Sequence, residues 1–150
     1  QSLKALKEGD TIEFTGPLGN LDFNPEKPAV MFAGGIGITP FRSIVSQHFI
    51  QAEPQRIHLH YANRSESDVP FLAELESVAE YDPNFKMTNL LSEKGQRLDA
   101  DYVKDQVARS LPETIFYIVG PPGMVKDVRE ALKAAGVPED RIKAESFVGY

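Results

Sequence analysis

The sequence has 150 residues, about the size of one domain and enough to bury a core. Hydrophobic residues make up 41% of it and charged residues 25%, the balance of a globular protein. Its 16 Lys and Arg residues against 22 Asp and Glu give a net charge of -6, which argues against a nucleic acid or an anionic membrane as a partner.

The chain contains no cysteine, which excludes disulfide bonds, thiolate zinc sites and cysteine-ligated iron–sulfur clusters within it. No apolar run approaches the roughly 20 residues of a membrane-spanning helix, and no signal-peptide pattern opens the chain. We therefore expect a cytoplasmic protein. Because residue 1 is Gln rather than Met, we also expect a fragment or a processed chain, and a membrane segment upstream of Gln1 stays open.

The first expected element is a short strand at residues 11–14, followed by a turn-rich segment at residues 16–20. The loop at residues 24–28 is polar and contains two prolines, which indicates a domain boundary. We place that boundary so that residues 1–24 and 25–150 form separate parts.

Beyond the boundary, apolar strands alternate with amphipathic helices. Thr39 is expected to cap the first helix and Pro40 to take its first position, Phe71 to point inward from the second, and Asp99 to cap the third. The expected strands cover residues 29–33, 56–61, 85–91, 115–119 and 142–147, and the second and fourth helices cover 70–80 and 124–135. Strand–helix pairs in this order predict an α/β protein with a doubly wound, five-stranded parallel sheet and right-handed crossovers.

Two turns at the carboxyl ends of the expected strands carry unusual sequences. Ligands in doubly wound sheets bind beyond these ends, where the strand order switches. Residues 34–40, GGIGITP, follow the first strand, and their glycines allow a pyrophosphate to approach the backbone beside a helix N-terminus. Residues 120–124, GPPGM, follow the fourth strand and would leave a slot for a flat ring. Either turn alone could be purely structural, but two at the switch-point strands are more specific.

The order of four motifs resembles the signature of the ferredoxin–NADP+ reductase superfamily. The motifs are GPLG at residues 16–19, GGIGITPF at 34–41, VGPPGM at 119–124 and ESF at 145–147. The resemblance runs from about Gly9 to the C-terminus. It implies an NAD(P)-binding domain at residues 25–150, preceded at residues 1–24 by a short remnant of the FAD-binding β-barrel.

The resemblance also implies roles for individual residues. The pyrophosphate and nicotinamide would be lined by Gly34, Gly35, Gly37, Ile38, Thr39 and Pro40, and the opposite wall formed by Gly120, Pro121, Pro122 and Met124. The Thr39 hydroxyl would lie near the flavin–nicotinamide contact, and Glu145 would be a carboxylate that assists hydride passage. Phe147 would stack on the isoalloxazine ring, and Tyr150 would lie near the adenine end of the flavin.

The sequence departs from the family pattern at two places. Val119 stands where relatives of the plant enzymes have Cys, which we interpret as altered packing of the pocket. The family also holds flavin with an Arg-x-Tyr-Ser/Thr motif in its barrel, and this chain has none. FAD is therefore expected in the complete protein.

Cofactor choice depends on the ends of the second and third strands, because a carboxylate binds the ribose of NAD and cationic groups bind the 2′-phosphate of NADP. Arg64 could serve either, and Ser92 is expected to contact the same part of the nucleotide. Since an acid such as Glu93 would repel a 2′-phosphate, we expect NADH. Lys94 and Arg97 keep NADPH open.

The expected function is that of a flavin-dependent oxidoreductase in which NAD(P)H passes hydride to FAD. Electrons would then reach an acceptor such as a ferredoxin or another iron–sulfur or haem protein. Two alternatives stay open: a nucleotide-binding module without turnover, and the dehydrogenase domain of a membrane ferric reductase or NADPH oxidase. No metal site is expected, because His58 and His60 share a strand face without a third ligand and are interpreted as packing beneath a helix.

Overall fold

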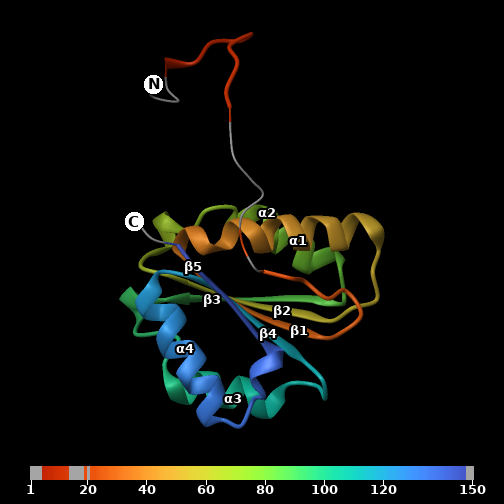
Figure 1. The fold of residues 1–150 in the computed structure, drawn as a ribbon, viewed down its shortest axis with the longest axis vertical. Coiled ribbons are helices and arrows are strands. Elements are labelled where there is room, and N and C mark those ends of the chain that lie inside the picture. Colours follow the sequence, from red (N-terminus) through yellow and green to blue (C-terminus); the bar gives the residue numbers. More distant parts are fainter. Residues whose placement is uncertain (1–4, 14–18, 20, 148–150) are drawn as a thin grey trace.

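A parallel sheet of five strands lies between two pairs of helices (Figure 1). The computed structural model describes residues 5–13, 19 and 21–147. The strands are β1 (Ala29–Gly34), β2 (Ile57–Asn63), β3 (Phe85–Leu91), β4 (Ile115–Gly120) and β5 (Ile142–Ser146). They pair in the order β3-β2-β1-β4-β5, so the order switches between β1 and β4. The structure confirms the predicted α/β doubly wound sheet, with every strand within two residues of its expected bounds.

The helices cover both faces of this sheet. They are α1 (Ile38–Gln51), α2 (Leu72–Tyr81), α3 (Ala100–Arg109) and α4 (Pro122–Ala134). The helices α1 and α2 lie on one side, and α3 and α4 lie on the other (Figure 1). The central strands therefore bury both of their faces, and all six residues of β1 are buried.

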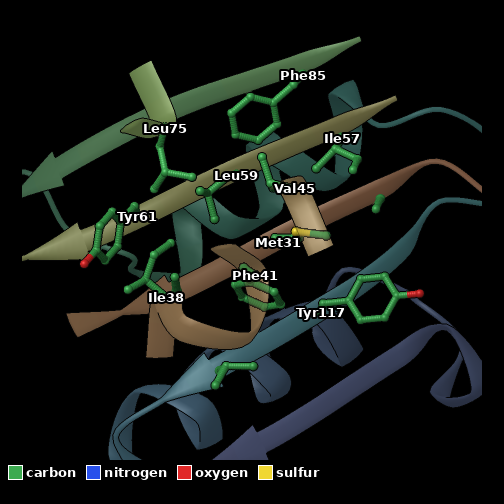
Figure 2. Packing of buried hydrophobic residues seen from close by; sticks show 13 residues of the cluster. Met31, Ile38, Phe41, Val45, Ile57, Leu59, Tyr61, Leu75, Phe85 and Tyr117 are labelled. Carbon is green, nitrogen blue, oxygen red and sulfur yellow. The ribbon is translucent and has the colours of Figure 1, made fainter. Parts of the chain in front are cut away.

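Alternate residues of the central strands β1 and β4 contribute to two cores, one on each face. Toward α1 and α2, Met31, Leu59 and Tyr117 pack with Phe41 and Leu75 (Figure 2). The second core, toward α3 and α4, contains Phe32, Phe116, Ile118, Val103, Val128 and Leu132. A sheet packed on both sides holds the carboxyl ends of its strands in fixed positions, which is where the site is expected.

The helix starts agree only in part with the sequence prediction. The side chain of Asp99 accepts a hydrogen bond from the backbone N–H of Tyr102 at 2.9 Å, so the predicted cap of α3 is confirmed. The predicted cap of α1 is wrong. A short 3₁₀ turn at Gly35–Gly37 runs directly into α1, so Gly37 precedes the helix and the Thr39 hydroxyl donates to the Ile36 carbonyl at 3.1 Å.

Phe71 also departs from its predicted inward position. It precedes α2 with a left-handed backbone (φ 60) and is 40% exposed. The guanidinium of Arg42 lies 4.5 Å from the centre of its ring. The same guanidinium pairs with the Glu74 carboxylate through Nε and Nη2, each 2.9 Å from Oε2. This tertiary contact holds the ring at the surface.

The predicted packing of His58 and His60 beneath a helix agrees with the structure, in which His60 contacts α3 and His58 lies beside His60. Their ring centres are 4.0 Å apart, and His60 Nδ1 is 2.8 Å from the hydroxyl of Tyr102 on α3. Burial, with a smaller contribution from His58, lowers the pKa of His60 to about 3. Among the described residues, no group of three or more His, Cys, Asp and Glu could hold a metal ion.

The N-terminal segment differs from the expected strand. Residues 11–13 form no strand, and residue 14 lies outside the described residues. A barrel strand needs a neighbouring strand for its hydrogen bonds, and residues 5–13 lie away from the sheet in Figure 1. By contrast, Leu21 and Phe23 pack against the core that faces α1 and α2. The boundary between residues 24 and 25 stays a prediction.

Candidate functional site

The two glycine turns predicted from sequence pack directly on each other. A Cβ on Gly37 would collide with the backbone of β4, lying 2.6 Å from the Val119 carbonyl carbon and 2.9 Å from the Gly120 Cα. A Cβ on Gly120 would lie 3.2 Å from the Gly34 Cα and 2.8 Å from the Met124 methyl carbon. These glycines are therefore required for close backbone packing at the switch point.

At two other positions in the same turns, close packing does not require glycine. A Cβ on Gly35 or on Gly123 would meet no atom of the described chain within 4 Å. Gly35 has a φ of +52, which itself favours glycine, whereas Gly123 lies in the first turn of α4. Their missing side chains leave the surface above both turns open to a ligand.

An open groove of about 690 Å³ lies beside these turns, at the carboxyl ends of four strands. Volumes of this size are typical of small-molecule sites. The groove is lined by Gly34, Gly35, Ala62, Asn63, Arg64, Ser92, Gln96, Arg97, Leu98, Pro121, Gly123, Met124 and Asp127. The N-termini of α1 and α4 follow the two turns, and helix N-termini favour negatively charged groups.

Charged residues near the groove are arranged differently from the sequence-based expectation. Arg64 and Arg97 line it, whereas neither Glu93 nor Lys94 does. The carboxylate of Glu93 accepts a hydrogen bond from the backbone N–H of Glu66 at 3.3 Å, and Lys94 pairs with the Glu66 carboxylate at 3.2 Å. The repulsion of a 2′-phosphate expected from Glu93 therefore has no support in the groove lining.

Polar groups at the end of β2 are unsatisfied by the described protein. The side-chain nitrogen of Asn63 is buried without a hydrogen-bond partner there, and Asn63 lines the groove. Burial raises the pKa of the neighbouring Tyr61 to about 12, so its hydroxyl stays protonated. The Asn63 side chain interacts with the Tyr61 hydroxyl and offsets part of this rise in pKa.

Glu145 and Phe147 lie at the end of β5, beside the GPPGM turn. The backbone N–H of Phe147 donates to the Gly120 carbonyl at 3.0 Å, and the Phe147 side chain packs on the core facing α1 and α2. Glu145 is half-buried, and its carboxylate oxygens would lie 2.8 and 3.0 Å from a Cβ on Gly19. Gly19, the last residue of the GPLG motif, thus lies beside the predicted carboxylate although 126 positions separate the two in the sequence.

The structure brings together only some of the predicted site residues. Those lining the groove are Gly34, Gly35, Arg64, Ser92, Pro121 and Met124. Those outside its lining are Gly37, Ile38, Thr39, Pro40, Gly120, Pro122, Glu145 and Phe147, and Ile38 is fully buried in the core. Tyr150 lies outside the described residues. The roles given to all these residues stay predictions.

Sequence reasoning did not assign several lining residues. Asn63 and Gln96 are isolated polar residues without a motif, and Asp127 appears only as one of many charges on an amphipathic helix. Their position at strand ends or on the first turns of α4 was the available signal.

Comparison with known proteins identifies the family. The sequence profile of the oxidoreductase NAD-binding domain matches residues 31–130. The chain is 36% identical over 129 residues to the plasma membrane-associated coenzyme Q6 reductase PGA3 of Saccharomyces cerevisiae, covering 79% of this chain and 41% of that protein. It is 32% identical to a flavohemoprotein of Rhodopirellula baltica, covering 95% of this chain and 38% of that protein.

A solved structure agrees in fold. The Amycolatopsis cytochrome P450 reductase GcoB matches with a TM-score of 0.77 and 26% identity, covering 97% of this chain and 46% of that one. The chain thus spans less than half the length of these relatives. No helix among the described residues is long and apolar enough to cross a membrane.

Proposed function

Because the chain belongs to the oxidoreductase NAD-binding domain family, we propose that it binds NAD(P)H in the groove and provides the dinucleotide half of a flavin-dependent reductase. The observation that carries this proposal is the pair of glycine turns. The two turns pack closely because three positions, Gly34, Gly37 and Gly120, have no Cβ. The surface above the turns is open at Gly35 and Gly123, where a Cβ would meet no other atom of the described chain. Close packing of the turns accounts for the glycines at positions 34, 37 and 120, but it does not account for a glycine at position 123.

The charge distribution supports an orientation for the dinucleotide. Arg64 and Arg97 would hold the adenosine end, and the N-termini of α1 and α4 would face the pyrophosphate. The nicotinamide end would then reach toward Glu145 and Phe147. The Phe147 side chain packs on the other face of the sheet from Met124. Two arginines in the lining support binding of NADPH, and the preference for NADH stays a prediction.

The flavin fits this chain only in part. Phe147 offers an aromatic face and Glu145 a carboxylate beside the proposed nicotinamide position, but the Arg-x-Tyr-Ser/Thr motif is absent. We therefore assign FAD binding to the complete protein. In that protein the nicotinamide would supply a hydride and the flavin would accept it. This chain would orient the dinucleotide, with Thr39 and Glu145 near its reactive end.

The acceptor is proposed from the relatives. Flavohemoproteins and a cytochrome P450 reductase are among the matches, which favours a haem protein or domain, with an iron–sulfur protein such as a ferredoxin as the other candidate. A cytoplasmic location is part of the same proposal.

Titration calorimetry with NADH and NADPH tests the groove. Gly123→Leu should abolish binding or weaken it by at least about tenfold, because its side chain would occupy the open surface, where a Cβ meets no atom of the described chain within 4 Å. Ala73→Leu, an exposed change on α2, is the matched control. Equal affinities in Gly123→Leu and Ala73→Leu would refute the assignment.

A nucleotide-binding module without turnover is the second candidate, favoured by the missing flavin motif. Under this interpretation the chain binds NAD(P)H but neither binds FAD stoichiometrically nor reduces an added acceptor. A titration of this chain with FAD, followed by flavin fluorescence, tests the module interpretation, because tight one-to-one binding would exclude it.

A further inference from the structure

A second cavity, of about 590 Å³, lies at the opposite edge of the sheet from the nucleotide groove. It is bounded by the amino ends of β1, β2 and β3 and by the C-terminal end of α3. Since β2 is seven residues long, the two sites are roughly 20 Å apart at a rise of about 3.3 Å per residue. The cavity is therefore separate from the proposed dinucleotide site.

Its charge is opposite to that of the chain as a whole. Arg56 and Lys86 line it from the strand side and Arg109 from α3, while the lining residues include no Asp or Glu. The chain carries a net charge of -6, so a cavity whose charged side chains are all cationic is not a consequence of composition.

Two of these cations form no ion pair with the described residues. In the ranges that the structure describes, neither Arg56 nor Lys86 forms an ion pair, whereas Arg109 pairs with Asp105 at 2.8 Å. Like charges held around one concavity repel each other, and their field raises the local concentration of anions.

The remaining lining has both polar and apolar groups. Gln106, Asn84 and Ser110 offer hydrogen-bonding side chains, and Val30 and Leu111 offer apolar surface, of which Leu111 is 40% exposed. Such a mixed lining, at a volume within the usual range of small-molecule pockets, suits an organic anion better than a bare ion.

We propose that this cavity is a second binding site, for a small organic molecule that carries two or more phosphate or carboxylate groups. Arg56 and Lys86 bind one anionic group, and Arg109 binds the other from the opposite wall. The site recognises charge placed at two ends of a molecule, which distinguishes it from a surface that attracts single ions.

The test uses citrate as a polycarboxylate and fructose 1,6-bisphosphate as an organic diphosphate, each titrated into the full chain and followed by backbone amide NMR shifts. At least one probe should bind with a Kd below about 1 mM and shift Ala29, Ile57 and Thr114 rather than Gly35, Ser92 and Gln96. The probe that binds more tightly identifies the anionic group.

A charge-matched pair of variants makes the test specific. Arg56→Gln/Lys86→Gln should weaken binding by at least about tenfold, since charge-assisted hydrogen bonds are lost. Lys104→Gln/Lys126→Gln, which removes two exposed cations elsewhere, should leave it unchanged. Binding by neither probe, shifts confined to the nucleotide groove, or equal weakening in both variants would overturn the proposal.

Discussion

Replacing His60 should reduce the loss in the free energy of unfolding that occurs as the pH is lowered below 7. Its pKa is lowered to about 3 in the folded chain, chiefly by burial and secondly by His58, against 6.5 for an ordinary histidine. Between these values the unfolded chain binds the extra proton and the folded chain does not, so stability falls as the pH is lowered. At about 1.4 kcal/mol per pKa unit, this residue alone removes about 2 kcal/mol between pH 8 and pH 5.

Urea unfolding at pH 8, 6 and 5, followed by circular dichroism, measures this loss. His60→Gln keeps a polar group for the Tyr102 hydroxyl but does not titrate, so its free energy of unfolding should fall far less than that of the wild type. His58→Gln, which leaves His60 in place, serves as the comparison and should retain most of the slope. Parallel pH profiles for the wild type and His60→Gln would refute the assignment of the loss to this residue.

Three further substitutions test the turns and the groove. Gly37→Ala should lower the free energy of unfolding by about 1–3 kcal/mol in urea melts, because its Cβ would overlap the Val119 carbonyl group; stability equal to the wild type would contradict the packed-turn geometry. Gly19→Ala should displace the Glu145 carboxylate, seen as a changed side-chain carboxyl ¹³C shift; an unchanged shift would mean that the two do not touch. Arg97→Gln should weaken NADPH and 2′,5′-ADP by about tenfold and NADH much less in calorimetric titrations; an equal loss for NADH would place Arg97 away from the 2′-phosphate.

The fold was predictable because its signals are local and repeat along the chain. Strands such as Ala29–Gly34 and Ile115–Gly120 are continuous apolar runs, which only a sheet covered on both faces requires. Asp99 had a clear cap signature. The start of α1 was not predictable in the same way, because the 3₁₀ turn before it depends on the contact of Gly37 with β4 rather than on its own sequence.

The two glycine turns of the site were predictable from their motifs, whereas lining residues outside the motifs were not. Glycine spacing located both turns, but sequence could not show that Gly37 serves packing while Gly123 faces open space. Side-chain direction was the other missing information. The sequence identified Glu93 as an acid near the nucleotide. It could not show that the Glu93 carboxylate accepts a hydrogen bond from the backbone of Glu66, because that bond is a tertiary contact. Phe71 is similar, since Arg42 decides where its ring lies.

A crystal structure of the chain with bound NADP+ would locate the dinucleotide. We expect it along the groove, with its 2′-phosphate at Arg64 and Arg97 and its pyrophosphate over Gly35 and Gly123. A nucleotide bound at any other surface, with these four residues free of contact, would contradict this expectation.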